Sequence, residues 1–551
     1  MSSRGAVDAG DDGTSIAAPR PVWPVSVSFA TSRRPVLRWA LPDGVDGARV
    51  EVCADRACVT QLVAFDVPGD RGAPPSDLPP GVVFWRLRGE AGGAIGAQPG
   101  APWELVVPAA SAPVSTAWGA MLDANGDGFG DVAVGDSDAH TPTQHVYVHH
   151  GGPGGPSAVP SSVLSAPAPV VQYASSIASA GDVDGDGFAD LLVGSPQEGL
   201  VRVYRGGPAG YADPPAWTLA GPPESSFGAA VSGAGDVDGD GYADVVVGLP
   251  LRSPPAGSQV QGAAILYYGA PGGPSAGRSV ELGARVGSDA QGVGTFVSSA
   301  GDVDGDGLAD VAVWGGIEST DPQYVFLYLG GDPAFGSAPS RLLQYDGADE
   351  SWLGSANLLV CAGDMDGDGT TEVAVGTPVS AGVGGGLDHF SVFLGGAGGP
   401  AAVPSRRVLS PLASADHFAL SLAALDADQS GVDDLAVTAA AYEQPAPDTL
   451  VYSGLGESPG VTLATVDVTI LLEREVGSAG DVDGDGFPDL FVGFPSRTTE
   501  VDDAGSPGVG ALHGAVEIHA GGPAGVSLAA KWTLVPPDTT VVAYGASLAR
   551  P

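Results

Sequence analysis

Apolar residues in this chain occur in short runs, and many of them alternate with polar residues. The runs "VSVSF", "ARVEVCA" and "GVVFWRLRG" lie within the first hundred residues, and "LLVGSP" and "VVVGLP" follow further along. Period-two alternation, and short apolar runs bounded by turn residues, are typical of β-strands. The pattern therefore predicts an all-β protein built from many short strands.

The composition supports this prediction. Of the 551 residues, 86 are glycine and 48 are proline. This opposes long helices, because an interior Gly costs about 1 kcal/mol and an interior Pro about 3 kcal/mol. The hydrophobic fraction of 43% argues against a disordered chain. Since the length exceeds one ordinary core, we expect a small domain and a large repeat domain.

The first part of the chain divides into three segments. Residues 1–20 are rich in Gly, Ala and Asp and are predicted to be disordered. Residues 21–108 hold six or seven short strand patterns separated by turns, which predicts a small β-sandwich. In this pattern the segment resembles a fibronectin type III domain, with Trp39 and Trp85 as core aromatics. Residues 109–116 are interpreted as a linker.

Residues 117–551 repeat one unit. Aspartate-rich loops begin at Asp123, Asp182, Asp236, Asp302, Asp364, Asp426 and Asp481, at intervals of 54 to 66 residues. Each loop precedes an apolar run such as "LFVGFP", and a second strand pattern then ends in a Gly-rich turn such as "VRVYRGGPAG". A unit of three or four short strands cannot bury both faces alone, so neighbouring units must stack. A closed ring meets this need, and we predict a seven-bladed β-propeller.

One copy of the unit carries a specific resemblance. The segment Phe227–Pro250, "FGAAVSGAGDVDGDGYADVVVGLP", resembles the FG-GAP repeat of the integrin α-subunit head and of many bacterial extracellular proteins. The resemblance extends over residues 114–551. Other copies depart from it: Phe227-Gly228 alone keeps the Phe-Gly pair, and Trp314-Gly315 and Thr438-Ala439 replace the closing Gly-x-Pro. The resemblance implies a partner bound on the face opposite the aspartate loops.

The loops have the chemistry of a hard-cation site. In Asp182-Val-Asp184-Gly-Asp186-Gly-Phe188-Ala-Asp190, acidic side chains occupy positions 1, 3, 5 and 9, and such close carboxylates repel unless a cation lies between them. The carbonyl of position 7 adds a neutral oxygen. Six or seven hard oxygens without nitrogen or sulfur suit Ca²⁺ and not zinc. An EF-hand is rejected, because ligation here closes at position 9 on a strand rather than at position 12 on a helix.

We therefore expect up to seven calcium ions, each held by positions 1, 3, 5, 7 and 9 of one loop. The predicted ligands are Asp123, Asn125, Asp127, Phe129, Asp131, Asp182, Asp184, Asp186, Phe188, Asp190, Asp236, Asp238, Asp240, Tyr242, Asp244, Asp302, Asp304, Asp306, Leu308, Asp310, Asp364, Asp366, Asp368, Thr370, Glu372, Asp426, Asp428, Ser430, Val432, Asp434, Asp481, Asp483, Asp485, Phe487 and Asp489. The first loop is weakened by the neutral Asn125, the fifth closes with Glu372, and the sixth, with Ser430 at position 5, is the weakest candidate.

Charge and cysteine content narrow the range of partners. The formal net charge of −43 opposes binding to nucleic acid or anionic membranes. No apolar run reaches the length of a membrane span, and no signal peptide is visible. Cys53 and Cys58 bracket "CADRAC"; a metal site would need further Cys or His ligands nearby, so we favour a disulfide. An oxidising, extracellular or cell-surface location follows from that disulfide.

We expect a non-enzymatic adhesion or recognition protein with a protein or glycan partner. The insertions Leu251–Gly262 and Ser496–Leu512 are candidate contact segments. A structural subunit or spacer of a surface assembly is an alternative, and a calcium-dependent polysaccharide lyase is a second one. A lyase needs a cluster of Lys, Arg or His, whereas the sequence has one lysine and scattered arginines. His149 and His150 are interpreted as turn residues, and "GESPG" as a chance match to a nucleophile motif.

The end of the sequence bears on ring closure. The segment "VVAYGASLARP" resembles the opening strand of a repeat, with Tyr544-Gly545 in the place of Phe227-Gly228. We predict that Val541–Leu548 forms a strand beside the first blade and closes the ring. The alternative is a truncated eighth repeat that remains a frayed tail.

Overall fold

The computed structural model describes residues 16–549 with gaps, and it shows strands, turns and loops without any helix in the described part. The gaps are 24–27, 30–32, 36, 80, 108–121, 128, 137–143, 167–169, 171, 187, 241, 252–261, 284–289, 307, 318–322, 346–358, 369, 378–388, 412–416, 429, 431, 441–448, 457–458, 464–474, 486, 496–513 and 538–543. The all-β prediction is confirmed for the described residues. Among them, no helix has the length and apolar character needed to cross a membrane.

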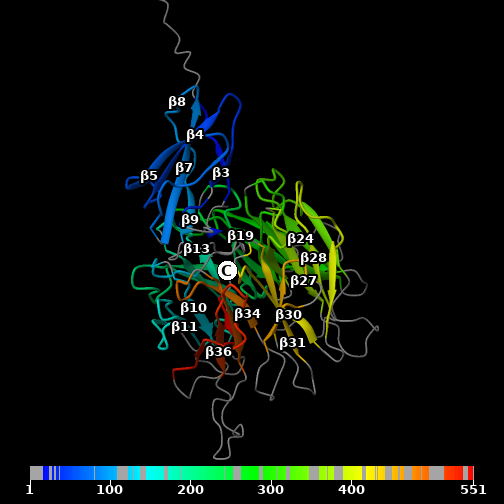
Figure 1. The fold of residues 1–551 in the computed structure, drawn as a ribbon. Helices are drawn as coiled ribbons and strands as arrows, with labels where there is room; N and C mark the ends of the chain where they lie inside the picture. The colour runs from blue at the N-terminus through cyan, green and yellow to red at the C-terminus, as the bar shows by residue number, and fades with distance from the viewer. Residues whose placement is uncertain are drawn as a thin grey trace, which may run out of the picture.

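Residues 16–107, called here the N-terminal module, form two sheets on one side of the other strands (Figure 1). One sheet has the order β1 (Arg20–Trp23), β3 (Leu37–Ala40), β6 (Arg71–Gly72). The other has the order β2 (Ser28–Phe29), β9 (Trp103–Val107), β7 (Gly81–Ala91), β4 (Gly47–Cys53), β5 (Gln61–Pro68), and β8 (Ala94–Ile95) pairs with β7.

The two sheets of the module share one core. Trp39 of β3 and Trp85 of β7 are both buried in it, as predicted from the sequence. Trp103 lies edge-on to Trp85, with ring centroids 6.0 Å apart, an arrangement that aromatic pairs prefer. The aromatic positions of the strand pattern therefore form the centre of the module.

The start of the module differs from the prediction. Residues 1–20 were expected to be disordered, but β1 begins at Arg20, and the carbonyl of Ala17 packs so closely on Gly89 that a Cβ there would lie 2.0 Å away. The prediction does not hold for residues 16–20, because this backbone contact places them in the fold. Residues 1–15 and the predicted linker at 109–116 lie outside the described residues.

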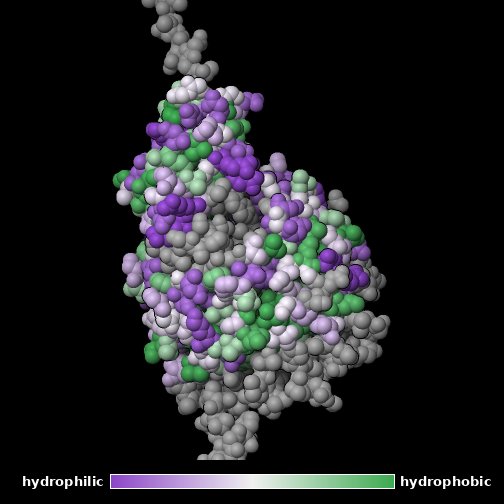
Figure 2. All heavy atoms as spheres, in the orientation of Figure 1, coloured by the Kyte–Doolittle hydropathy of each residue, from purple (hydrophilic) through white to green (hydrophobic). Residues whose placement is uncertain are grey.

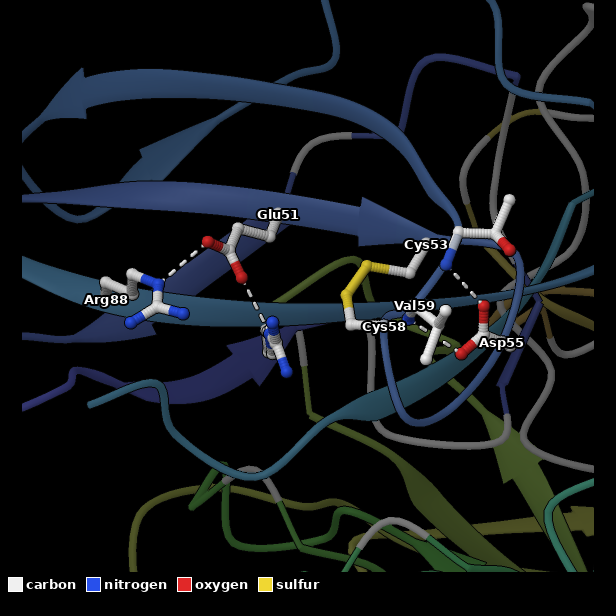
Figure 3. Close-up of a disulfide and its surroundings, with 8 residues drawn as sticks. Glu51, Cys53, Asp55, Cys58, Val59 and Arg88 are labelled. Carbon is white, nitrogen blue, oxygen red and sulfur yellow. Dashed lines mark hydrogen bonds and ion pairs between the residues drawn. A yellow bond between two sulfur atoms is a disulfide. The ribbon is translucent and has the colours of Figure 1, made fainter. Parts of the chain in front are cut away.

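A short loop at the end of β4 is closed by the predicted disulfide. Cys53 and Cys58 are bonded, with their Cα atoms 5.1 Å apart (Figure 3). The carboxylate of Asp55 accepts hydrogen bonds from the backbone N–H groups of Val59 and Thr60, at 2.9 and 2.7 Å. These bonds hold the loop in one conformation, so Arg56 at its tip has a fixed position.

Seven further sheets follow in the described part of the chain; six come from one sequence unit each, and the first is completed by a strand from the C-terminal end. In strand order, the first sheet is β38 (Ser547–Leu548), β10 (Val132–Gly135), β11 (His145–His149), β12 (Ser162–Ser165); the second is β13 (Ser176–Gly181), β14 (Asp190–Ser195), β15 (Leu200–Tyr204), β16 (Trp217–Ala220); and the third is β17 (Val231–Gly235), β18 (Asp244–Leu249), β19 (Ala263–Tyr267), β20 (Ser279–Leu282). In the fourth sheet β21 (Ala290–Gln291) and β22 (Val297–Gly301) both pair with β23 (Asp310–Ile317), which is followed by β24 (Gln323–Tyr328) and β25 (Arg341–Tyr345). The fifth sheet is β26 (Leu359–Gly363), β27 (Glu372–Thr377), β28 (His389–Phe393), β29 (Arg406–Leu409); the sixth is β30 (His417–Leu425), β31 (Asp434–Ala440), β32 (Thr449–Ser453), β33 (Val461–Leu463); and the seventh is β34 (Glu475–Gly480), β35 (Asp489–Phe494), β36 (Ala515–His519), β37 (Trp532–Leu534). All pairs within these sheets are antiparallel.

Each core lies between two neighbouring sheets, because the central strands are apolar on both faces. Val201 of one sheet packs in a cluster with Val245 of the next, and the same relation recurs along the chain. A cluster with Val134 and Val516 joins the first sheet to the seventh. The sheets therefore follow one another in a closed circle, which is consistent with a β-propeller.

Hydrogen bonds between the aspartate loops follow the same circle. In six of the seven loops the backbone N–H at position 8 donates to the carbonyl at position 1 of the preceding loop, as from Ala243 to Asp182 at 3.1 Å. Position 8 of the seventh loop is Pro488, which has no N–H, and there Gly522 donates to the carbonyl of Ala427 in the sixth loop at 2.9 Å. Gly130 of the first loop donates to Asp481 of the seventh at 2.8 Å. The loops thus form a ring of their own at one edge of the sheets.

The C-terminal end completes the first sheet. Strand β38 pairs with β10, with Leu548 opposite Val134, and Tyr544 forms a bridge with Gly514 of the seventh unit. The buried Tyr544 hydroxyl lies 2.7 Å from Nε2 of His149. The predicted closing strand is present at Ser547–Leu548; Tyr544 forms a single bridge and Gly545 and Ala546 lie in a turn, so the prediction does not hold for these three residues, while residues 541–543 lie outside the described residues.

We expect deletion of residues 544–551 to destabilise the protein by about 4 kcal/mol or more, because it removes two buried side chains, Tyr544 and Leu548, from the contact between the first and seventh sheets. The measurement is chemical denaturation, with deletion of residues 550–551 alone as the control. Equal stability of the two deletion variants would contradict the closing role of the C-terminal strand.

Candidate cation-binding loops

Five of the predicted loops bring carboxylates into close groups. In each group three ligand oxygens lie within 4.8 Å of one another. The groups are Asp182, Asp184 and Asp190; Asp236, Asp238 and Asp244; Asp302, Asp304 and Asp306; Asp364, Asp366 and Glu372; and Asp481, Asp483 and Asp489. Positions far apart in the loop therefore converge in space, as the sequence pattern predicted.

The loop at Asp182 shows how the backbone produces this convergence. The loop follows β13, whose pairing with β14 shifts register between Ser179 and Gly181. Gly185 then adopts a φ of 76°, a conformation that favours glycine. This turn lets one oxygen of Asp182 accept hydrogen bonds from the N–H groups of Gly185 and Asp186, at 2.6 and 3.0 Å. The first carboxylate is thereby held at the centre of the loop.

The position-9 carboxylate comes from the start of the following strand. Asp190 is fully buried; its Oδ2 accepts the N–H of Val183 at 3.0 Å and its Oδ1 that of Gly206 at 2.9 Å. The same pair of bonds is made by Asp310 and by Asp489. These bonds fix the side chain against the loop, where it stands opposite position 1.

Burial and mutual repulsion make these carboxylates costly to ionise. Desolvation, followed by the charge of the position-1 aspartate, raises the pKa of Asp190 and of Asp244 well above the ordinary value. Burial raises the pKa of Glu372 and of Asp489 to about 8. A buried carboxylate of this kind is stabilised in its charged form by a nearby cation.

The residues present fit a hard divalent cation. The donors in each group are carboxylate oxygens, without nitrogen or sulfur, which is the ligand set that Ca²⁺ prefers. Asp184 is nine-tenths buried, and its Oδ1 has no hydrogen-bond partner among the described residues. A buried acceptor without a donor is unfavourable unless something else binds it. The loop therefore has both the chemistry and an available oxygen for a cation.

Position 7 was predicted to supply a backbone carbonyl as a ligand. The structure shows a hydrogen bond made by the backbone N–H of this position. In six loops this N–H donates to the position-5 carboxylate, at 2.8 to 3.1 Å; the donors are Phe129, Phe188, Tyr242, Leu308, Thr370 and Phe487. This bond tightens the turn between positions 5 and 7. The ligand role of the position-7 carbonyls stays a prediction.

The first and sixth loops differ from the other five. In the first, the Asn125 amide donates to Asp127 at 2.8 Å, and burial raises the pKa of Asp131. In the sixth, the Ser430 hydroxyl donates to the Val432 carbonyl at 3.2 Å, so the two predicted ligands bond to each other. Burial still raises the pKa of Asp434 to about 7. The neutral side chains at positions 3 and 5 weaken both loops as cation sites.

The sequence analysis did not find the basic residues beside the loops. Nε of Arg205 lies 2.6 Å from Asp184 and 2.8 Å from Asp186. Arg278 lies 2.8 Å from Asp240, and Lys531 forms an ion pair with Asp483. Arg205 follows β15, the third strand of its sheet, and Arg278 and Lys531 precede the outermost strands β20 and β37. They offset part of the negative charge and hold the outer carboxylates in place.

Two family models match the chain, and they match it at these loops. A model described as an FG-GAP-like repeat matches residues 182–247 and 302–375, and one described as an FG-GAP repeat matches residues 475–512. The chain contains FG-GAP-type repeats. The matched segments include the loops that begin at Asp182, Asp236, Asp302, Asp364 and Asp481, the same five that form close carboxylate groups.

Integrin α-subunits are similar to part of the chain. Integrin alpha-4 of Xenopus laevis is 32% identical over 150 residues, 26% of this chain and 14% of that protein. Integrin alpha-5 of Xenopus laevis is 35% identical over 144 residues, 23% of this chain and 14% of that protein. Integrin alpha-PS2 of Drosophila melanogaster is 34% identical over 167 residues, which are 26% of this chain and 11% of that protein. The matched segments span no more than 14% of these relatives, and together with the repeats they support an FG-GAP β-propeller.

The raised pKa values predict how the metal-free protein responds to pH. Glu372 and Asp489 have folded-state pKa values of about 8, so the folded chain binds more protons than the unfolded chain at intermediate pH. The contribution that these protonated carboxyl groups make to folding stability is therefore present at low pH and is lost as the pH rises through the folded-state pKa. We expect the melting temperature of metal-free protein to fall between about pH 5 and about pH 8.

The same scan at high ionic strength is the control, because salt screens surface charges more than buried ones. A melting temperature that stays constant or rises with pH at high ionic strength would contradict the role of the buried carboxylates.

Proposed function

We propose that this protein is a calcium-binding adhesion or recognition protein of the extracellular space or cell surface. The observation that carries the proposal is the recurrence of one all-oxygen carboxylate group in five loops of a ring. Such loops bind Ca²⁺ through positions 1, 3, 5, 7 and 9, with all seven loops as candidates and those at Asp123 and Asp426 the weakest. The disulfide at Cys53–Cys58 supports an oxidising compartment.

The proposed architecture is a seven-bladed propeller of a bacterial FG-GAP type with an N-terminal module resembling fibronectin type III domains. Seven sheets in the described residues, with cores shared between the seventh and the first, support the blade number. Two sheets around Trp39 and Trp85 support the sandwich. The proposed domains are 21–108 and 117–551, the first extended to about residue 16 by the contact of Ala17 with Gly89.

The proposed partner is a protein or glycan on the face opposite the loops. The module already contacts the loop face, because the guanidinium of Arg56 lies over the ring of Tyr242 in the third loop, and this leaves the opposite face for a partner. Figure 2 shows hydrophilic and hydrophobic residues interspersed over the described surface in this view. The candidate segments Leu251–Gly262 and Ser496–Leu512 fall mostly outside the described residues.

A binding screen of the calcium-loaded protein tests this proposal. A glycan array and a pull-down of surface proteins would identify the partner. Failure of both would favour the structural spacer, and cleavage of a uronate polymer would favour the lyase. In this proposal the protein has no enzymatic activity, because the carboxylates of the loops serve to bind a cation.

Calcium is expected to set stability. Each site filled at about ten times its dissociation constant contributes about 1.4 kcal/mol, so seven sites contribute about 10 kcal/mol. Chelation should therefore lower the melting temperature by many degrees, and Mg²⁺ should restore it poorly because it requires tighter octahedral geometry. Differential scanning calorimetry measures the effect. An unchanged melting curve in chelator, with no calcium retained, would contradict the proposal.

The loops are expected to differ in strength. Asp184→Ala removes a charged ligand from a complete loop and should release about one calcium ion per chain. Ser430→Ala should release less, because that loop already lacks one carboxylate and Ser430 bonds to Val432. Elemental analysis of both variants at equal free calcium gives the comparison. Equal losses would show that the ranking of the loops is wrong.

A further inference from the structure

The N-terminal module places an arginine between its own Phe84 and the aspartate loops. Arg56, at the tip of the disulfide-closed loop, has its guanidinium carbon 3.4 Å from the ring centroid of Tyr242 and 5.3 Å from that of Phe84. Its side chain is 10% exposed. The contact reaches the second loop too, because a Cβ on Gly185 would lie 2.4 Å from Nε of Arg56. The module is therefore seated on the second and third loops.

The module also brings a carboxylate to the second loop. Glu104 lies in β9 and is 1% exposed. Its carboxyl group lies against that of Asp182, the position-1 residue of the loop, and Nη2 of Arg56 is 3.8 Å from Oε2 of Glu104. Figure 1 shows β9 at the end of the module that faces β13 and the loop. The second loop thus has an acidic neighbour from a different domain.

The charges at this junction do not balance. Glu104, Asp182 and Asp190 are all nearly fully buried, and they join Asp184 and Asp186. Arg56 lies over an aromatic ring, and Arg205 is paired with Asp184 and Asp186. Among the described residues of this junction, buried carboxylates outnumber the guanidinium groups, and like charges buried together oppose the docked arrangement unless they are neutralised. A divalent cation in the loop would supply the missing positive charge.

A separate observation at the same loop favours a bound ligand. Asp184 is nine-tenths buried and belongs to the group of close oxygens with Asp182 and Asp190. Its Oδ1 has no hydrogen-bond partner among the described residues. The oxygen is therefore available to a cation at the same loop that Glu104 contacts.

We propose that the second loop is an interdomain calcium site, in which Glu104 of the N-terminal module and the Asp182 loop hold one ion between them. The inference rests on the proposed calcium binding and extends it: the ion fixes the position of the module on the ring. Another contact of the module, among the described residues, has a different character, because Arg20 donates to the Asp306 carbonyl of the fourth loop and brings no acid. The disulfide, Asp55 and their hydrogen bonds (Figure 3) hold Arg56 beside the site.

The test compares Glu104→Gln with Glu90→Gln, the same substitution in the same module away from the loop. Calcium titration of metal-free full-length protein by calorimetry gives the number and affinity of sites. Hydrogen exchange of the amides in 53–58 and 182–190, with and without calcium, reports docking independently of affinity. Glu104→Asp, which keeps the charge on a shorter side chain, serves as a second variant.

In the wild-type protein and Glu90→Gln, calcium should slow exchange in both segments. In Glu104→Gln one site should weaken by about 10- to 100-fold, and calcium should no longer protect residues 53–58, while protection of 302–310 persists. Glu104→Asp should show a smaller change in the same direction. If Glu104→Gln matches Glu90→Gln in sites, affinity and exchange, the interdomain site is overturned and the proposed function stands. If the wild-type protein binds no calcium, both are overturned.

Discussion

The repulsion between carboxylates gathered in each loop is the constraint on which the rest of the structure depends. Position 9 is fixed at the start of a central strand, and in the loop at Asp182 the backbone N–H groups hold position 1 at the centre, so the charges cannot move apart without breaking hydrogen bonds. The same loops carry the bonds that join neighbouring units, such as Ala243 to Asp182. A charge that is unbalanced in one loop therefore acts on the contact between two sheets. Neutralising the carboxylates of a loop therefore also stabilises the contact between neighbouring sheets.

The fold and the loops could be predicted from the sequence because their signals are local. Alternating apolar residues identify strands within a few positions, and the spacing of Asp182, Asp184, Asp186 and Asp190 identifies a ligand set within nine. Tyr544-Gly545 could be assigned to ring closure because it repeats a local phrase. In each case the residues that matter are near one another in the chain, and the units repeat the information.

The remaining features depend on contacts between distant segments, which local patterns do not report. Arg205 follows β15 and Lys531 precedes β37, and both reach the loops only once the sheet has formed. Glu104 and Arg56 resemble ordinary residues of a small sandwich until the module is placed on the ring. His149 looked like a turn residue, yet it is buried and its partner, Tyr544, is 395 residues away. The early start of the module was missed because Gly- and Ala-rich composition conceals a backbone contact.

Closure by β38 has a consequence for the order of events during synthesis. The first sheet obtains its pairing with Ser547 and Leu548 only after the chain has been made almost to the last residue described. At about 5–20 residues per second, His149 waits on the order of tens of seconds for Tyr544 to emerge. Until the strands of the seventh sheet are made, near the end of that interval, the first sheet exposes the apolar face that later meets it, and the nascent chain is open to association with other chains. The N-terminal module, whose strands are complete early, can fold long before the ring does.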